Sequence, residues 1–281
     1  MTTRTQRQAL DGLVFPEVPR WKNGELWLCD FQVWVPGASG QVLAVGRDGE
    51  ARTIIDQVPG GPANGLAWLP DGRLLITTGK VPAVLALGVD GVLTRYADLS
   101  GLTSYGCNEI AVDSAGRAYV GTCKVPPDPQ VHSEVLLVQP NGRGAEVADT
   151  TMRFPNGFMI TPDGGTLIVA ESTGHCLSSF SIDDDGSLHD KRVWAALPGM
   201  VPDGPCLDQE GCVWLADAIG KACVRVAEGG TIVDRIETEQ DAFACTLGGD
   251  DGRTLYIATS VNPFTGARPS GRPGKVIAVD L

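Results

Sequence analysis

The sequence predicts an all-β fold, a six-bladed β-propeller with four antiparallel strands in each blade, and three observations support this prediction. A small or polar residue, a turn glycine seven or eight positions later, and a short strand recur six times along the chain. The six motifs start at Glu17, Asn64, Asn108, Asn156, Asp203 and Cys245. Their spacing of about 42 to 48 residues is typical of propeller blades. The 36 glycines and 19 prolines fit many tight turns, and no stretch has the pattern of a continuous helix.

The first repeat shows how each blade is built. Its predicted strands are residues 17–21, 26–29, about 41–45 and about 52–58. Gly24 lies in the first turn, and the pair Asp48-Gly49 lies in the third. Such dipeptides favour tight hairpins because glycine and asparagine tolerate a positive φ. Later repeats keep this turn chemistry, so the same four-stranded meander is expected in each.

The last repeat is one strand short, because only residues 255–259 and 275–281 follow its innermost strand. A propeller closes its ring to remove free sheet edges. The segment 9–15 near the N-terminus is the available partner, and we expect it to supply the outermost strand of the sixth blade. Residues 1–281 are therefore predicted to form a single propeller domain.

Four oxygen-bearing residues begin innermost strands and should meet near the axis of such a ring: Glu17, Asn108, Asn156 and Asp203. The longer connections, between the second and third strand of each blade, fall on the same face, where binding sites usually lie. Carboxylate and amide oxygens are ligands that hard divalent cations take. The alternative is an axis filled by polar side chains and ordered water without any chemistry.

Composition excludes several classes of function. The net charge is −12, with 34 acidic and 22 basic residues and no basic run, which argues against nucleic-acid binding. No run of about 18 apolar residues and no apolar leader segment occur, so neither a membrane span nor secretion is expected. The eight cysteines lack CxxC or zinc spacing, which favours reduced packing residues in a cytoplasmic protein.

Other candidate catalytic residues are weaker. Cys245 starts the sixth motif and Cys107 precedes Asn108, but no base partner aligns with either, so both are interpreted as packing residues. His132 and His175 lie on loops of the site face and could bind substrate or shuttle a proton, although exposed loop histidines without a role are more common. The chain has no GxSxG motif, which disfavours a serine hydrolase.

Five segments carry a family resemblance that spans residues 15–260: EVPRW, CNEIAVDSAGRAYVG, FPNGFMITPDGGTLIVAES, GMVPDGPCLDQEGCVWLAD and FACTLGGDDGRTLYIAT. With these motifs the chain resembles the SMP-30/gluconolactonase/luciferin-regenerating enzyme family. The resemblance implies a metal-dependent hydrolase, most often a lactonase or gluconolactonase. It implies Glu17, Asn156 and Asp203 as metal ligands, and Asn108 as a contact of the substrate or of the metal's shell. Asp203 also matches the general base that activates water.

The implied cofactor is one divalent metal ion, with Ca²⁺ expected first and Mg²⁺, Mn²⁺, Zn²⁺ or Fe²⁺ as alternatives. The expected partner is a small lactone or ester, with no nucleic acid and no membrane, bound by a monomer or small homo-oligomer. The alternative functions are a calcium-dependent phosphotriesterase, a non-catalytic ligand-binding propeller and a family member recruited to biosynthesis.

The chain also departs from the family pattern. Val18 replaces a small residue after the glutamate, Glu109 replaces an aspartate after the asparagine, and no arginine stands near Gly106 and Cys107 to hold a sugar acid. Seven apolar or aromatic residues were candidates to line the mouth of the site: Phe15, Phe31, Trp34, Tyr105, Phe154, Met200 and Phe243. These features favour a less hydroxylated lactone or ester.

Overall fold

The computed structural model describes residues 4–32, 35–263 and 271–281, and its strands form six four-stranded antiparallel sheets. The residues group into two compact units. The first unit comprises Met1–Val58 with Asp203–Leu281, and the second comprises Pro59–Pro202. Among the described residues there is no α-helix, and the 3₁₀ segment η1 spans Pro140–Gly142. The predicted fold class, a six-bladed β-propeller, is confirmed.

The first unit holds three blades. Their strands are β2 (Pro16–Lys22), β3 (Glu25–Asp30), β4 (Gln41–Val45) and β5 (Ala51–Ile55); β18 (Pro202–Leu207), β19 (Val213–Asp217), β20 (Ala222–Val226) and β21 (Ile232–Glu237); and β22 (Asp241–Gly248), β23 (Thr254–Ser260), β24 (Gly274–Asp280) and β1 (Gln6–Leu13).

The second unit holds the other three blades. Their strands are β6 (Ala63–Trp68), β7 (Leu74–Thr78), β8 (Ala83–Leu87) and β9 (Leu93–Asp98); β10 (Gly106–Val112), β11 (Ala118–Cys123), β12 (Ser133–Val138) and β13 (Ala145–Met152); and β14 (Pro155–Ile160), β15 (Thr166–Glu171), β16 (Cys176–Ile182) and β17 (Leu188–Ala196).

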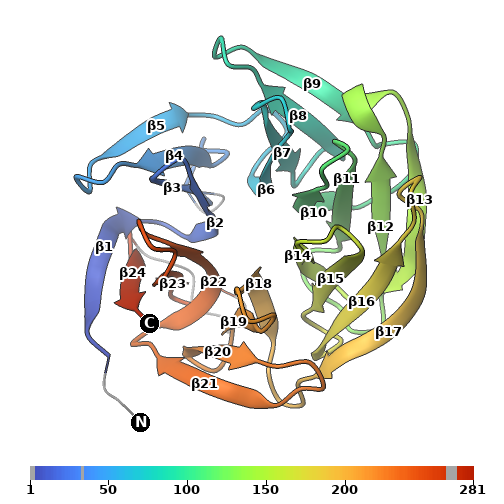
Figure 1. The fold of residues 1–281 in the computed structure, drawn as a ribbon. Helices are drawn as coiled ribbons and strands as arrows, with labels where there is room; N and C mark the ends of the chain where they lie inside the picture. The colour runs from blue at the N-terminus through green and yellow to red at the C-terminus, as the bar shows by residue number, and fades with distance from the viewer. Residues whose placement is uncertain (1–3, 33–34, 264–270) are drawn as a thin grey trace. The chain divides into compact units, whose positions relative to one another are not determined.

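Five sheets are simple meanders, and the sixth takes its outermost strand from the other end of the chain. Strand β1 pairs antiparallel with β24, so the order in this sheet is β1-β24-β23-β22 (Figure 1, blue beside red). The predicted N-terminal strand is therefore confirmed, with bounds Gln6–Leu13 in place of 9–15. Val14 and Phe15 instead form the crossing to β2, where both backbone N–H groups donate to the buried carboxylate of Asp30 at 2.8 Å.

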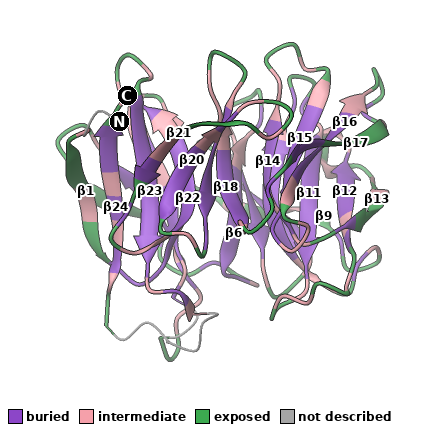
Figure 2. Ribbon diagram, turned by 90° about the horizontal axis from the view of Figure 1, so that it is seen from below, coloured by how far each residue is buried: buried purple, intermediate pink, exposed green. Residues whose placement is uncertain are grey.

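In each blade the inner and middle strands are more buried than the outermost strand. Every residue of β7 and β23 is buried. Strand β1 is mostly exposed and half of β13 is exposed, as Figure 2 shows for β1 beside the buried β23. Within the second unit, aliphatic side chains of neighbouring blades pack in one cluster, with Leu75 and Val84 against Ile110 and Val120. Such burial is the main stabilising contribution to an all-β fold. No helix of the described residues has the length and apolar character needed to cross a membrane.

Candidate metal and catalytic site

Three of the predicted site residues lie in or beside places where the innermost strands depart from regular pairing. The pairing register shifts between Glu17 and Arg20 in β2, between Cys107 and Ile110 in β10, and between Pro155 and Phe158 in β14. A β-bulge leaves a residue out of the ladder and redirects its side chain, and bulges are frequent beside active sites. Asn108 and Asn156 lie inside these shifts, whereas Glu17 is paired with Cys29 and is the last paired residue before its shift.

In the second unit, two predicted site residues are in direct contact. Asn108 Nδ2 donates to Asn156 Oδ1 at 2.8 Å and to the backbone carbonyl of Pro155 at 2.9 Å. Both amide hydrogens of Asn108 are therefore used, and its Oδ1 is the atom left to face a ligand. Asn108 can then serve only as a hydrogen-bond acceptor or an oxygen ligand. It cannot donate to a developing negative charge on a substrate.

In the first unit, Glu17 and Asp203 are each the second residue of an innermost strand, β2 and β18. The Asp203 side chain is only 7% exposed. The next residue, Gly204, has φ +35°, and a Cβ built on it would lie 2.2 Å from Ala244 Cβ. Only glycine fits at position 204, between strands β18 and β22, because any side chain there would collide with β22. This close approach fixes the backbone that carries Asp203.

Val18, the residue after Glu17, is in an unusual conformation. Its φ is +56°, although it is β-branched, and its side chain is 1% exposed. Left-handed backbone costs a non-glycine residue roughly 1–2 kcal/mol and is rarest for β-branched side chains. Its N–H donates weakly to Glu17 Oε2 at 3.3 Å. Strain of this kind is frequent at functional sites, where the surrounding structure holds it in place.

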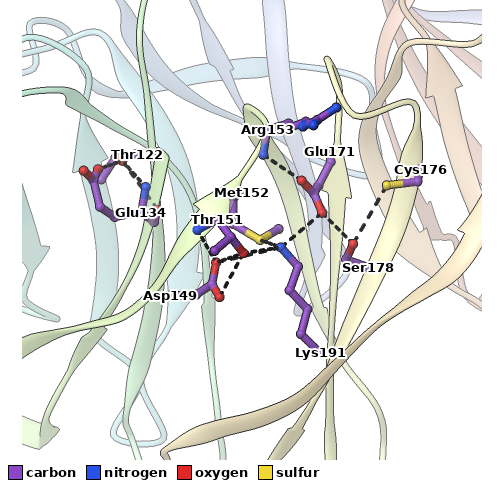
Figure 3. A network of polar contacts seen from close by, with 10 residues as sticks. All are labelled: Thr122, Glu134, Asp149, Thr151, Met152, Arg153, Glu171, Cys176, Ser178 and Lys191. Carbon is purple, nitrogen blue, oxygen red and sulfur yellow. Dashed lines mark hydrogen bonds and ion pairs between the residues drawn. The ribbon is translucent and has the colours of Figure 1, made fainter. Parts of the chain in front are cut away.

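A buried carboxylate, Glu171, holds the chain that leads into Asn156, and sequence analysis did not identify it. Its Oε2 accepts from the backbone N–H of Arg153 at 2.6 Å, and its Oε1 accepts from Ser178 Oγ at 2.5 Å (Figure 3). Lys191 Nζ lies 3.6 Å from the same Oε1. Asp30 plays the same part in the first blade by binding Val14 and Phe15. The sequence does contain a signal for both residues, because each is an acidic residue at the end of the second strand of its blade.

The predicted apolar mouth is only partly supported. Phe15 and Phe243 are buried, at 3% and 1% exposure, and their ring centroids lie 4.5 Å apart. Phe31 packs on Phe15 with a centroid distance of 6.2 Å. These rings form a packed aromatic cluster in the first unit. Trp34 lies outside the described residues.

The two cysteines near the ring positions are packing residues, as interpreted from the sequence. Cys107 and Cys245 are fully buried members of two hydrophobic clusters. Burial raises the pKa of the Cys107 thiol to about 12 and also raises the pKa of Cys245. A protonated thiol is a poor nucleophile. Cys245 also does not hold the sixth ring position, since it pairs regularly with Ile257 and the bulge of β22 falls between Ala242 and Ala244.

The two loop histidines are both exposed. His175 Nδ1 lies 2.6 Å from the carbonyl oxygen of Met200, and its φ is +52°. A carbonyl only accepts, so Nδ1 carries the proton and Nε2 of the neutral ring has the lone pair. The contact ties this loop to the segment before Asp203.

Each unit offers oxygen atoms of the kind that hard divalent cations bind. Glu17 and Asp203 offer carboxylate oxygens, and Asn108 keeps an amide oxygen after its hydrogen bonds are counted. Oxygen ligands of this kind suit Ca²⁺, Mg²⁺ or Mn²⁺. Within the described residues, no group of three or more histidine, cysteine, aspartate or glutamate side chains could hold a metal ion.

Comparison with known proteins gives a family match over most of the chain. Residues 15–261 match the model described as "SMP-30/Gluconolactonase/LRE-like region". A 6-deoxy-6-sulfogluconolactonase of Pseudomonas putida is 31% identical over 54% of this chain and 53% of its own length. A diisopropyl-fluorophosphatase of Loligo vulgaris is 27% identical, over 65% and 64% of the two chains. The chain thus spans about half to two thirds of these relatives.

Solved structures show the same fold. A luciferin-regenerating enzyme superposes with a TM-score of 0.81 and 15% identity, covering 99% of this chain and 96% of the other. A gluconolactonase of Xanthomonas campestris superposes with a TM-score of 0.78 and 24% identity, covering 98% and 89%. At these identities the likeness extends to the architecture alone.

Proposed function

The chain belongs to the SMP-30/gluconolactonase/LRE-like family, and from this premise we propose that it is a metal-dependent hydrolase that opens a lactone. The single observation that carries the proposal is the paired arrangement of Asn108 and Asn156 on adjacent bulges. It fixes two amide groups at ring positions where the family pattern places a metal ligand and a substrate contact. Relatives with lactonase names support the same reaction class.

We assign Glu17, Asn156 and Asp203 as the ligands of one divalent cation, with Ca²⁺ expected first and Mg²⁺, Mn²⁺, Zn²⁺ or Fe²⁺ as alternatives. When bound, such an ion supplies Lewis acidity at the carbonyl of a lactone. Asn156 is suited to this role because its Oδ1 is already oriented by the Asn108 amide. Asn108 keeps its own Oδ1 for the substrate.

In the proposed reaction, the Asp203 carboxylate accepts a proton from water as the water oxygen attacks the lactone carbonyl carbon. The ring C–O bond then breaks, and the proton passes to the departing alkoxide oxygen, which gives the open hydroxy acid. Asn108 orients the substrate by accepting a hydrogen bond through Oδ1. Burial of Asp203, at 7% exposure, limits access of bulk water to its carboxylate.

A phosphotriesterase is the second candidate function. The similarity to a diisopropyl-fluorophosphatase over 65% of this chain favours it. The same residues would then act on a P=O group in place of a C=O group. A propeller that binds a small molecule without turnover is the remaining alternative.

The test is lactone hydrolysis by metal-stripped protein, with the five metals added back singly, across aliphatic, aromatic and sugar lactones. Metal-restored turnover is expected. The variant Asp203→Asn should lose turnover while it keeps the melting temperature of the parent within a few degrees, and normal turnover by this variant would refute the assignment of the base. Turnover of phosphotriesters alone would favour the second candidate, and metal binding without any turnover would favour the binding protein.

The proposal extends to the protein's location, its oligomeric state and its unfolding. We propose a cytoplasmic protein that acts as a monomer or small homo-oligomer on a small molecule, without nucleic acid or membrane partners. We also propose that residues 1–281 unfold as one domain. A single calorimetric transition, with equal calorimetric and van't Hoff enthalpies, would support this, and two separate transitions would contradict it.

A further inference from the structure

We infer that Ser172 is a positioning residue of the candidate site, because it holds the two chain segments that lead into Asn156 and Asp203. The inference rests on the proposed function, since it concerns residues that are assigned there to the metal and to the base. Ser172 has no part in that assignment. It follows the last residue of β15 and is only 4% exposed, so its contacts are made inside the protein.

The backbone of Ser172 holds the segment before Asn156. Its N–H donates at 3.1 Å to the carbonyl oxygen of Phe154, two residues before Asn156. Phe154 has φ +58°, which is unfavourable for a bulky side chain and persists only where the surroundings hold it. The residue before Ser172 is Glu171, which accepts from the N–H of Arg153 (Figure 3). Two consecutive residues therefore hold the strained position from both of its ends.

The side chain of Ser172 holds the residue before Asp203. Its Oγ donates at 2.8 Å to the carbonyl oxygen of Pro202. The ring of a proline fixes φ, so the remaining backbone freedom of Pro202 is its ψ, which sets the direction of this carbonyl. The carbonyl oxygen and the next Cα atom lie in one peptide plane. The bond from Ser172 therefore fixes the peptide plane to which the Cα atom of Asp203 belongs.

A ring residue makes the equivalent contact one blade earlier. Asn108 Nδ2 donates to the carbonyl of Pro155, the residue before Asn156. If this pattern continued, Asn156 would donate to the carbonyl of Pro202. Ser172 makes that contact instead. The Asn156 side chain is therefore left for the ligand set to which we assign it.

The hydroxyl group distinguishes this blade from the other five. Six residues directly follow the second strand of a blade, all of them in the described part of the chain, and Ser172 is the one with a hydroxyl. The others are Phe31, Gly79, Lys124, Ala218 and Val261. In the first blade the N–H of Phe31 donates to the carbonyl of Phe15, two residues before Glu17. The backbone contact thus belongs to the propeller, whereas the contact to Pro202 needs a serine at this place.

The test compares Ser172→Ala, which removes the hydroxyl, with Ser172→Thr, which keeps it, in the full chain. Calorimetric titration measures the affinity of the metal-stripped protein for Ca²⁺, and kcat and KM of the holoenzyme are measured with δ-valerolactone. Ser172→Ala should weaken Ca²⁺ binding and lower kcat by about tenfold each, with KM nearly unchanged, since residues that orient ligands matter on this scale. Ser172→Thr should stay within about threefold of the parent, because its hydroxyl makes the same bond. A threonine variant that melts like the parent but loses as much as the alanine variant would overturn the inference.

The matched control is Thr78→Val. Thr78 is the fully buried last residue of β7, and its Oγ1 donates to the carbonyl oxygens of Val81 and Ala83. This variant also removes a buried hydroxyl at the end of a second strand, but its partners do not lead into the candidate site. Urea unfolding without metal should show similar losses of stability for Thr78→Val and Ser172→Ala. If both also lose Ca²⁺ affinity and kcat equally, the effect belongs to general stability and the inference fails.

Ca²⁺ binding separates this inference from the proposed function. A parent protein that binds Ca²⁺ but hydrolyses no lactone would refute the proposed function, and weaker Ca²⁺ binding by Ser172→Ala would then keep the inference. If the parent binds Ca²⁺ and hydrolyses δ-valerolactone, a Ser172→Ala variant with the Ca²⁺ affinity of the parent would overturn the inference alone, whatever its kcat. A parent that neither binds Ca²⁺ nor hydrolyses a lactone would overturn both.

Discussion

Asn108 and Asn156 begin neighbouring innermost strands and are joined by a hydrogen bond of 2.8 Å from Nδ2 to Oδ1. The bond links side chains from two blades directly, and a second bond from the same nitrogen reaches the carbonyl of Pro155. One side chain thereby sets the orientation of another residue in the candidate site. Asn108 itself can then contribute only its Oδ1, as a hydrogen-bond acceptor or as a metal ligand.

The variant Asn108→Asp should destabilise the protein when it is stripped of metal. A carboxylate cannot donate, so it would face Pro155 O and Asn156 Oδ1 as a third acceptor. Loss of the two bonds should lower the free energy of unfolding by about 1–3 kcal/mol, measured by urea unfolding in chelator. Asn108→Ala is the control, because it removes the bonds without adding charge and should be less destabilising. An Asp variant as stable as the parent would contradict the assigned amide orientation.

Replacement of Val18 should separate backbone strain from side-chain burial. Val18→Ala and Val18→Gly both remove the buried methyl groups, but only glycine accepts φ +56° without cost. The glycine variant should therefore be more stable than the alanine variant by about 1 kcal/mol. This order is the reverse of that for ordinary strand positions. Urea unfolding of the two variants measures the difference, and an alanine variant of greater stability would show that Val18 is not strained.

The buried carboxylate of Asp30 should contribute strongly to the first blade. Asp30 accepts from the N–H groups of Val14 and Phe15 and from Gln32 Nε2. Asp30→Asn presents an amide to these donors and should cost about 1.5–3 kcal/mol of stability. Asp56→Asn is the matched control, since exposed Asp56 accepts one bond from Gln41 and its loss should be small. Equal effects of the two changes would argue against the assigned role of Asp30.

Stability should fall in alkaline solution, partly because of Tyr119. Burial, with a smaller contribution from the Asp113 charge, raises the pKa of Tyr119 to about 12. In the unfolded chain the phenol ionises near pH 10. The folded protein then holds the proton that the unfolded chain has lost, so stability is complete below pH 10 and falls as pH rises to 12. The expected loss is roughly 2–3 kcal/mol.

Tyr119→Phe tests this prediction. The variant loses the bond from Tyr119 Oη to the carbonyl of Gly186 at every pH, but it also loses the titrating group. Its stability should therefore decline less steeply than that of the parent between pH 10 and 12. Cys107 adds a similar slope from about pH 9, because burial raises its pKa to about 12 as well, and this slope should remain in the variant. Parallel curves for the two proteins would contradict the prediction.

Removal of residues 1–13 should destabilise the sheet of β22, β23 and β24. The deletion takes away β1 and leaves the backbone groups of β24 without their partner strand. An unpaired edge also invites association between chains. A lower melting temperature and a tendency to aggregate in light scattering are expected, whereas removal of residues 1–3 alone should change neither. A deleted chain that melts like the parent would show that β1 is dispensable.

Repeat spacing predicted the strands well because turn chemistry is local. The predicted strand 41–45 coincides with β4, and 26–29 lies within β3. Asn108 and Asn156 were found because a register shift recurs at the same place in their two blades, and Glu17 lies one position before the equivalent place in the first blade. The sixth blade differs, because its register shift falls between Ala242 and Ala244, before Cys245, which pairs regularly with Ile257. Cys245 therefore lies in the core.

The remaining features depend on side-chain geometry that spacing does not encode. Alternation cannot tell a packed aromatic side chain from one that lines a mouth, so it did not anticipate the close packing of Phe15 and Phe243. The bond between Asn108 and Asn156 depends on side-chain rotamers set by two blades. The part played by Glu171 depends on a contact with the distant backbone of Arg153. Such contacts appear only when strands from separate repeats are placed together.

The pairing of β1 with β24 has a consequence for biosynthesis. Residues 6–13 leave the ribosome early, but their partner strand spans residues 274–280. During translation β1 must wait with both of its edges unpaired, so the sheet can be completed only after residues 274–280 have been made. Contacts this distant in sequence form slowly. The nascent chain thus exposes the unpaired strand to aggregation and to chaperones until β24 is available.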